Sequence, residues 1–368
     1  MQGEPNLFLR DPEMIDIFKA AVQRGASDIH IKVGDFLRAR IHGELVPLTQ
    51  QRLSHEQVRQ ICMQLITNQM DRERFEDIKD YDCSWGAPGL GRFRVNILRQ
   101  RGTPMAVMRV IPIDIPSFET LRLPAVLSAI SQAERGLVLV TGVTGSGKSS
   151  TLAAIVGYIN NTRRRHIITL ENPIEFLHRD INCSITQREV GSDTSSFDQG
   201  LKSALREDPD VVMIGEMRDT TTIDTAMKAA ETGHLVLSTL HTTNAVQTIT
   251  RIIAVFPPHE QEMVRIRLAE TCVAIVSQRL LPRKDNRGRV VAAEVMVVTG
   301  TIADAIMQGG DKQHEIYDLI ADGKEQYGSQ TFDQHLRDLV EADLVSYEVA
   351  KAAANNPADF ELKMRTLV

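Results

Sequence analysis

The sequence predicts an α/β protein with two domains, in which a small α+β domain precedes a mostly parallel β-sheet covered by helices. Three observations lead to this prediction. The chain has 368 residues, which is long for one domain. Pro112 and Pro116 lie close together and mark a linker, because proline disfavours both helices and central strands. After this linker, short apolar runs alternate with helical patterns, an order typical of a parallel sheet with helices on both faces.

The composition is that of a globular protein, with 42% hydrophobic and 24% charged residues. A formal net charge of −6 argues against a nucleic-acid protein held mainly by a basic surface. The four cysteines contain no Cys-x-x-Cys pair, which favours buried, reduced thiols over a disulfide framework. No apolar run approaches the roughly 18 residues of a membrane span, and the N-terminus lacks a signal-peptide pattern. We therefore expect a soluble cytoplasmic protein that binds no nucleic acid, does not insert into a membrane, and reaches one only through a partner.

The first domain is expected to cover residues 1–111. A helical pattern over residues 11–24 begins it. Strand patterns follow at residues 29–33, 37–41, 81–85, 92–98 and 105–111. Between them, Ser54 and Gln57 form a capping box, which predicts a helix that runs to about Asn68.

The second domain is expected to cover residues 119–368, after a linker at residues 112–118. Four apolar runs predict buried parallel strands at residues 137–140, 167–170, 211–214 and 235–240. A further strand is expected at residues 290–298. The C-terminal part is expected to be helical, with one helix that begins at Ser346 and ends near Pro357.

The segment from Gly142 to Ser149 matches the pattern Gly-x-x-x-x-Gly-Lys-Ser/Thr without a mismatch. It joins an apolar run to the start of a helix, where free backbone N–H groups and the helix dipole favour an anion. Lys148 would reach the β- and γ-phosphates of a nucleotide, and the Ser149 hydroxyl would bind Mg²⁺. We therefore expect ATP and Mg²⁺ as cofactors. The expected nucleotide-binding residues are Gly142, Val143, Thr144, Gly145, Ser146, Gly147, Lys148, Ser149 and Ser150.

Carboxylates follow two of the apolar runs, at the sheet edge where ligands bind in open α/β sheets. Glu216 comes after residues 211–214 and is a candidate metal ligand beside Ser149, although the common pattern has Asp directly after the apolar run. Glu171 and Glu175 leave another strand at the same edge. Either could orient and deprotonate an attacking water, and their spacing does not decide between them.

Histidines flank the apolar run at residues 235–240. His241 follows it at the expected ligand edge and is a candidate sensor of the γ-phosphate. His234 lies at the opposite end of the same strand. A satisfied structural role is the alternative for both.

Arginines are frequent near the end of the first domain. Arg92 and Arg94 alternate along a strand and share a face, and Arg109 lies on the next strand. They are either solvated charges or arginine fingers that reach a phosphate from outside the second domain.

Taken together, these motifs resemble those of the PilT-type ATPases, the retraction motors of type IV pili within the secretion-ATPase superfamily. The segments that carry the resemblance are residues 26–30, 142–149, 171–175, 187–191, 206–210, 215–219 and 232–243. The resemblance implies a PAS-like N-terminal domain, a RecA-like C-terminal domain and a homo-hexamer. It further implies ATP hydrolysis that drives pilus retraction and twitching motility, peripheral association with the inner membrane through a pilus platform protein, and a paralogous pilus ATPase as another partner.

The resemblance also implies roles for individual residues. Glu175 corresponds to the Asp-box glutamate of the family and Glu216 to its Walker B glutamate. His234 and His241 correspond to the His-box histidines. The catalytic arginines of the family's N-terminal domain correspond best to Arg92, Arg94 and Arg109.

The chain departs from the family pattern in two places. Asn172 stands where the family usually has Asp. Ala303 and Met307 replace the two arginines of the family's retraction motif. These departures affect the retraction output more than ATP hydrolysis, so the alternative function is an accessory or regulatory ATP-binding paralogue with little turnover. A RecA-like nucleic-acid motor is less favoured, because no stretch combines aromatic and basic residues.

Overall fold

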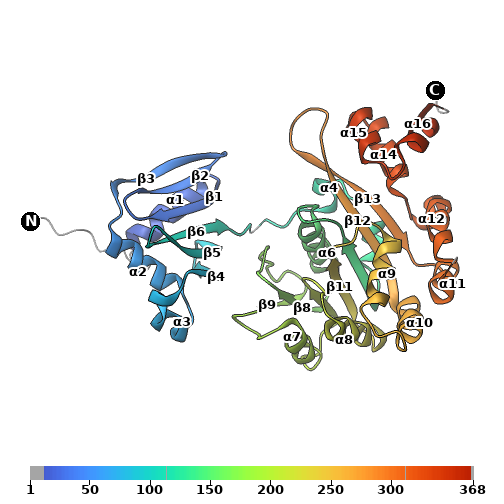
Figure 1. Ribbon diagram of the computed structural model, residues 1–368, viewed down its shortest axis with the longest axis horizontal. Coiled ribbons are helices and arrows are strands. Elements are labelled where there is room, and N and C mark those ends of the chain that lie inside the picture. The colour runs from blue at the N-terminus through green and yellow to red at the C-terminus, as the bar shows by residue number, and fades with distance from the viewer. Residues whose placement is uncertain (1–11, 113, 311, 366–368) are drawn as a thin grey trace, which may run out of the picture. The chain divides into compact units, whose positions relative to one another are not determined.

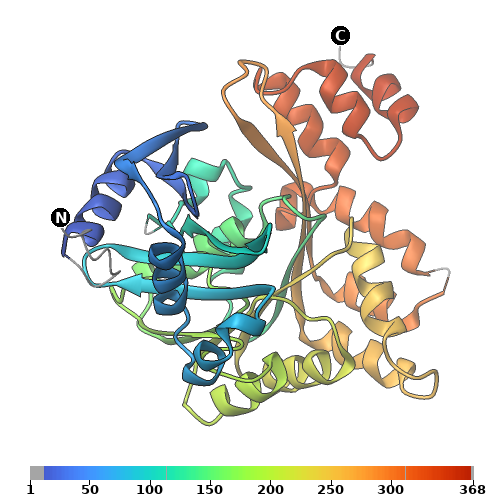
Figure 2. The same cartoon turned by 60° about the vertical axis from the view of Figure 1, so that its left-hand side comes forward.

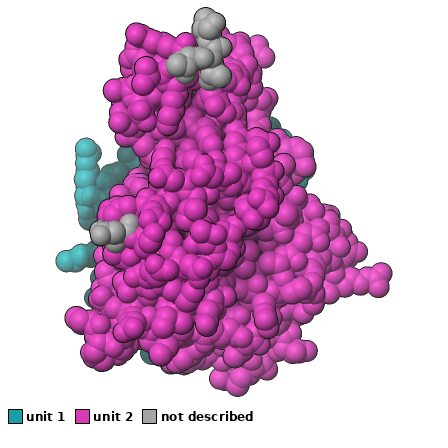
Figure 3. Space-filling view, turned by 90° about the vertical axis from the view of Figure 1, so that its right-hand side faces the viewer, with its two compact units in different colours: residues 1–114, 173–177 teal, residues 115–172, 178–368 magenta. Residues whose placement is uncertain are grey.

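The structure is a computed structural model that describes residues 12–112, 114–310 and 312–365. These residues divide into two compact units (Figure 3). The first unit runs to Asp114 and takes in the short segment Pro173–Leu177, and the second unit takes the remainder of the chain. The division after Asp114 falls inside the linker expected at residues 112–118. Nothing in the sequence indicates that Pro173–Leu177 groups with the first unit.

The first unit is built on an antiparallel sheet with the strand order β3-β2-β1-β6-β5-β4 (Figure 1). Its strands are β1 (Ala26–Lys32), β2 (Phe36–Ile41), β3 (Glu44–Arg52), β4 (Asp80–Ala87), β5 (Gly91–Gln100) and β6 (Thr103–Val110). Its helices are α1 (Pro12–Gln23), α2 (His55–Leu65) and α3 (Gln69–Glu73), followed by the 3₁₀ turn Phe75–Asp77. Apolar side chains at alternate strand positions pack with α1 and α2, so the polar side chains lie on the opposite face of the sheet.

The second unit contains a seven-stranded sheet with the order β13-β12-β7-β11-β10-β8-β9, parallel except for the pair β12–β13. Its strands are β7 (Gly136–Thr141), β8 (His166–Glu171), β9 (Ser184–Glu189), β10 (Val211–Ile214), β11 (Leu235–Leu240), β12 (Cys272–Pro282) and β13 (Arg289–Val297). Its helices are α4 (Phe118–Leu121), α5 (Val126–Ile130), α6 (Lys148–Thr162), α7 (Phe197–Ala204), α8 (Thr220–Glu231), α9 (Ala245–Ala254), α10 (Gln261–Thr271), α11 (Gly300–Gln308), α12 (Lys312–Asp322), α13 (Lys324–Tyr327), α14 (Phe332–Glu341), α15 (Tyr347–Ala353) and α16 (Pro357–Arg365).

Helices cover both faces of this sheet, as the sequence predicts. Leu137 and Leu139 of β7 point into one apolar core, which α7 to α12 complete. Val138 and Val140 point into the other core, on the side of α4, α5 and α6. Because β7 is buried on both faces, all its positions are apolar or small, and this explains the continuous apolar run in the sequence.

Two predicted helix boundaries are wrong. The helix that begins with the Ser54 capping box ends at Leu65, because Ile66 adopts an extended conformation and Asn68 caps the separate helix α3. The helix that begins after Ser346 ends at Ala353 instead of near Pro357. Pro357 begins α16, since proline suits the first turn of a helix, where its missing N–H has no intrahelical partner.

The C-terminal helices α14, α15 and α16 pack beside the hairpin of β12 and β13 (Figure 2), where Phe332 and Leu336 contact apolar residues of the two strands. A capping box of Thr331 and Gln334 fixes the start of α14. Among the described residues, no helix has both the length and the apolar character that a membrane span requires.

Candidate active site

The loop between β7 and α6 has a backbone conformation that only glycine adopts readily. Gly142 has φ of 145°, and a Cβ atom there would lie 2.4 Å from the Ser146 hydroxyl and 2.6 Å from the Gln278 carbonyl oxygen. The loop therefore wraps closely around Ser146, whose side chain is buried. Its hydroxyl has no hydrogen-bond partner in the described part of the chain. A buried, unpaired hydroxyl inside the loop fits a polar ligand such as a phosphate oxygen.

Lys148 is the first residue of α6 and folds back over the loop. Its ammonium group donates hydrogen bonds to the carbonyl oxygens of Gly142 (2.9 Å) and Val143 (3.0 Å). These contacts hold the positive charge at the mouth of the loop, within reach of an incoming phosphate. Ser149 and Ser150 follow in the first turn of α6, where their half-buried hydroxyls are available to a metal ion or a phosphate.

Strand β12 supports this loop, although it was not among the predicted strands. The Thr141 hydroxyl donates to the Ser277 hydroxyl (2.8 Å), and the Gln278 amide donates to the Thr151 hydroxyl (2.7 Å). These buried bonds join β7 and α6 to the neighbouring strand. The apolar run at residues 272–276 is the signal in the sequence that could have revealed this strand.

Glu216 lies just beyond the carboxyl end of β10, and His241 lies just beyond the carboxyl end of β11. One carboxylate oxygen of Glu216 is 2.6 Å from the Arg218 guanidinium, and the other is 3.5 Å from His241 Nε2. The register places β11 between β7 and β10, so the phosphate loop and this cluster occupy the same edge of the sheet. The sequence predicted Glu216 and His241 at this edge and missed Arg218.

The turn that carries Glu216 is held to β11 by two hydrogen bonds. The Thr239 hydroxyl donates to the Gly215 carbonyl (2.6 Å), and the Met217 N–H donates to the Thr239 carbonyl (3.2 Å). A hollow of about 480 Å³ opens beside the cluster, and its lining includes Arg218 and His241. The turn that carries Glu216 is therefore fixed to β11, and the two residues paired with its carboxylate, Arg218 and His241, border open space.

The two remaining candidate carboxylates differ in accessibility. Glu171 ends β8 and is 8% exposed, and it accepts hydrogen bonds from Thr169 (2.7 Å) and Gln187 (3.1 Å). Glu175 is exposed and lies in Pro173–Leu177, the segment that groups with the first unit. Glu171 is buried and bonded to residues of β8 and β9, so the exposed Glu175 is the better candidate for the proton acceptor.

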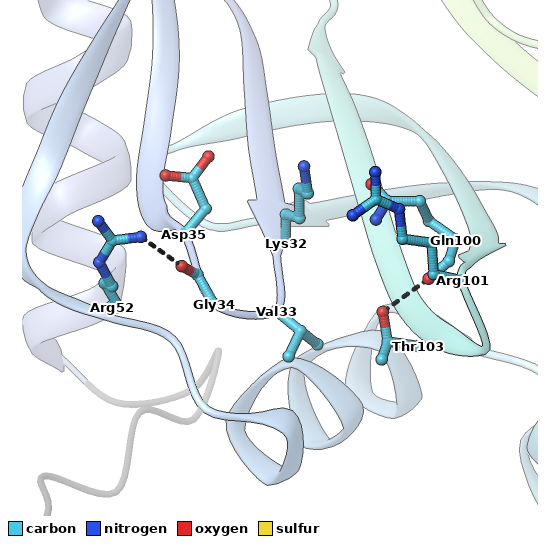
Figure 4. Close-up of a pocket in the computed structure, with 8 residues that line it drawn as sticks. All are labelled: Lys32, Val33, Gly34, Asp35, Arg52, Gln100, Arg101 and Thr103. Atoms are coloured by element: carbon cyan, nitrogen blue, oxygen red, sulfur yellow. Dashed lines mark hydrogen bonds between the residues drawn. The ribbon is translucent and has the colours of Figure 1, made fainter.

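The structure does not bring the other predicted site residues into this cluster. His234 lies at the amino end of β11, and its Nδ1 is 2.9 Å from the Ala229 carbonyl oxygen. Arg92, Arg94 and Arg109 belong to the first unit. A separate hollow of about 490 Å³ in that unit contains none of the predicted site residues (Figure 4). Basic side chains dominate its lining, namely Lys32, Arg52 and Arg101.

A metal ion at the phosphate loop would need oxygen atoms from the nucleotide. In the described ranges, no group of three or more His, Cys, Asp and Glu side chains could hold a metal ion. A serine hydroxyl and one carboxylate, as in Ser149 and Glu216, suit Mg²⁺, which usually takes few protein ligands and completes its shell with phosphates and water. The residues therefore fit Mg²⁺–ATP.

Comparison with known proteins extends over almost the whole chain. Residues 12–348 match the family described as type II/IV secretion system protein. The chain is 43% identical over 348 residues to the type IV pilus retractation ATPase PilT of Pseudomonas aeruginosa, and the match covers 95% of this chain and 100% of that protein. It is 41% identical over 355 residues to the type IV pilus ATPase PilU of the same organism, covering 96% and 91%.

Solved structures agree with this similarity. A crystal structure of the pilus retraction motor PilT with bound ADP superimposes with a TM-score of 0.85 at 41% identity, covering 95% of this chain and 98% of that one. The Legionella pneumophila ATPase DotB superimposes with a TM-score of 0.82 at 29% identity, covering 96% and 98%.

Proposed function

The chain belongs to the type II/IV secretion system protein family and has the RecA-like fold of the secretion ATPases, and from this premise we propose that it hydrolyses ATP to drive type IV pilus retraction. One observation carries the proposal most directly. A phosphate loop with its lysine and the Glu216–His241 pair share one sheet edge within a single unit. Pilus retraction is inferred from the similarity to PilT.

The phosphate loop binds the nucleotide through its backbone N–H groups and through Lys148. The ammonium group exchanges its contacts with Gly142 and Val143 for phosphate oxygens and neutralises part of their charge. Ser149 and Glu216 would hold Mg²⁺, which would supply further positive charge to the phosphates.

Glu175 accepts a proton from the attacking water. The water oxygen forms a bond to the γ-phosphorus as the bond from this phosphorus to the β-γ bridging oxygen of ADP breaks. His241 steadies the Glu216 carboxylate from 3.5 Å, and Arg218 does so from the other side. His234 contacts Ala229 and Thr232 at the C-terminal end of α8, so its contacts within its own subunit favour a structural role.

Arg92, Arg94 and Arg109 complete the site from a neighbouring subunit of a hexamer. The phosphate edge of the second unit offers Lys148, Arg218, which is paired with Glu216, and Arg251 beside the hollow, and the arginines of the first unit would add positive charge to these. The hexamer works at the cytoplasmic side of the inner membrane with a pilus platform protein and with a paralogous pilus ATPase.

The Lys148→Ala variant tests the proposal. We expect it to lose productive ATP binding and phosphate release, because Lys148 is the cation that this loop places against the β- and γ-phosphates. Phosphate release and nucleotide affinity would be measured on the purified protein, with Lys202→Ala as the control, since Lys202 pairs with Asp198 on the exposed face of α7. Unchanged affinity and turnover in folded Lys148→Ala would refute the assignment.

An accessory role is the second candidate, because Ala303 and Met307 of α11 replace the arginines of the retraction motif. The two candidates differ in a single measurement on the unmodified protein. A retraction motor releases phosphate at steady state, whereas an accessory subunit binds ATP with little release. Twitching and pilus length in a strain that lacks the gene then test retraction itself.

A further inference from the structure

A row of charged residues crosses the first unit, on the sheet face opposite its apolar core. The strand register pairs Arg40 of β2 with Asp28 of β1, Asp28 with Arg109 of β6, and Arg109 with Arg94 of β5. The residues beside them in sequence, such as Ile29, are buried in the core. Because side chains alternate along a strand, the four charged residues share the other face.

Asp28 is held tightly within this row. Its side chain is 9% exposed, and its two oxygens accept hydrogen bonds from Arg109 Nε (2.9 Å) and the Ser27 hydroxyl (2.8 Å). Burial raises the pKa of Asp28, but the hydrogen bonds from Ser27 and Arg109 and the charge of Arg109 outweigh it and lower the pKa below its ordinary value. The carboxylate is therefore ionised at neutral pH.

The row contains more positive charge than Asp28 can balance. Arg40 donates to the carbonyl oxygen of Gly43 (2.8 Å). Arg94 is exposed and makes no hydrogen bond or ion pair within the described residues, yet it lies directly opposite Arg109. Like charges that face each other across two strands are unfavourable. Among the described residues Arg94 thus has no anionic partner, and a further anion beside Arg94 and Arg109 would offset this repulsion.

The contact between Asp28 and Arg109 leaves the outer end of that guanidinium available. Asp28 accepts from Nε, so the two terminal nitrogens of Arg109 point away from this bond. The Arg109 side chain is 69% exposed, and so exposed an ion pair contributes little to stability. The ion pair between Asp28 and Arg109 instead fixes the direction of the arginine, because a planar guanidinium held at one nitrogen presents the others in a defined orientation.

We propose that Asp28 is a positioning residue that aims Arg109, so that Arg94 and Arg109 together bind the transferring phosphoryl group of a neighbouring subunit. This inference rests on the proposed function of the arginines. Two guanidinium groups side by side match the several oxygens of a phosphoryl group, which would supply such an anion. Asp28 belongs to the sequence segment 26–30, whose residues have no place in the hydrolysis site itself.

The test compares steady-state kcat and KM of the assembled protein. Asp28→Ala, which removes both carboxylate oxygens, should lower kcat by about ten- to a hundredfold, the range for a slightly misplaced catalytic group, and leave the KM for ATP within about twofold because the phosphate loop is intact. In an Arg109→Gln background, Asp28→Ala should have no further effect, since Asp28 acts through that arginine. Arg40→Gln is the matched control on the same row and should keep the unmodified kcat.

Three results would overturn the inference: an unchanged kcat in folded Asp28→Ala, an equal loss of kcat when Asp28→Ala is added to Arg109→Gln, or full kcat in Arg109→Lys. The last variant keeps the positive charge and removes the Nε contact with Asp28, so it also serves if Asp28→Ala fails to fold. If Arg94→Gln and Arg109→Gln keep full activity while Lys148→Ala is inactive, the arginines have no catalytic role and the ATPase assignment stands. Activity in Lys148→Ala would instead refute the proposed function.

Discussion

At the scale of single residues, the environment of a carboxylate separates a structural role from a chemical one. Glu171 and Glu175 both follow the strand at residues 167–170, and their spacing makes either a candidate proton acceptor. In the structure, Glu171 is buried and receives hydrogen bonds from Thr169 and Gln187. A buried carboxylate is less accessible to an attacking water than an exposed one. Glu175 is exposed and has the accessibility that the reaction requires.

We expect Glu175→Gln and Glu216→Gln each to slow hydrolysis by at least about a hundredfold while nucleotide binding is largely kept, since they remove a proton acceptor and a metal ligand. Glu171→Gln should slow it far less, because the glutamine oxygen still accepts from Thr169. Phosphate release and ADP affinity measure the two effects. If Glu171→Gln lost most of its activity while Glu175→Gln stayed nearly active, Glu171 and not Glu175 would be the proton acceptor.

At the scale of elements, the start of α9 connects the His241 strand to the interior of the second unit. The Asn244 side chain caps α9 by accepting from the Gln247 N–H (2.8 Å), and Glu294 of β13 accepts from the Ala245 N–H (2.7 Å). Both bonds satisfy N–H groups that the helix itself leaves free. The segment that follows His241 is thus fixed by a buried carboxylate from a strand far along the sequence.

The pKa of Glu294 is raised to about 7. Burial is the main cause, the hydrogen bond from the Ala245 N–H and the charge of Arg279 oppose it, and the charge of Asp333 adds to it. Because the pKa in the folded state exceeds that in the unfolded state, the contribution of Glu294 to stability is full below about pH 4.5 and is lost as the pH rises to about 7. We therefore expect Glu294→Gln to gain stability relative to the unmodified protein as the pH rises from 5 to 8, by on the order of 3 kcal/mol.

Urea unfolding at the two pH values measures this difference. The glutamine keeps an oxygen that accepts from the Ala245 N–H and cannot ionise, so it isolates the titration of Glu294. Glu262→Gln on the exposed face of α10 is the control and should show no such pH dependence. A stability difference that stays constant between pH 5 and 8 would show that Glu294 does not titrate in this range.

At the scale of the whole molecule, the phosphate loop and the candidate arginines lie in different units. Lys148 and Glu216 belong to the second unit, and Arg92, Arg94 and Arg109 belong to the first. In the proposed arrangement, the first unit of one subunit supplies its arginines to the phosphate loop of a neighbouring subunit. A site shared in this way would couple each hydrolysis event to movement of one unit relative to another.

Mixing two inactive variants tests the shared site. Lys148→Ala and Arg94→Gln should each be nearly inactive, since an arginine supplied by a neighbour is worth about a thousandfold or more in turnover. After subunit exchange at equal amounts, the mixture should regain up to about a quarter of full phosphate release, because about one interface in four pairs an intact loop with an intact arginine. Activity that stays at zero after demonstrated exchange, or full activity in an isolated monomer, would reject the shared site.

Local patterns in the sequence are enough to predict the phosphate loop, four buried strands of the second unit and the Ser54 capping box. These features depend on residues within a few positions of one another: glycines that permit the loop conformation, apolar runs buried on both faces, and a side chain that bonds to a nearby backbone N–H. Other features depend on residues far apart in the chain. Strands β3 and β9, for example, carry mostly polar or partly exposed residues and were not predicted.

The pairs that give the polar residues their roles are formed only by sheet register. Arg109 meets Asp28 from 81 positions away, and His241 meets Glu216 because β10 and β11 lie side by side. Burial likewise distinguishes Glu171 from Glu175, which their spacing in the sequence does not. Register and burial are set by the packing of the whole sheet, whereas the patterns in a sequence report only on neighbouring residues.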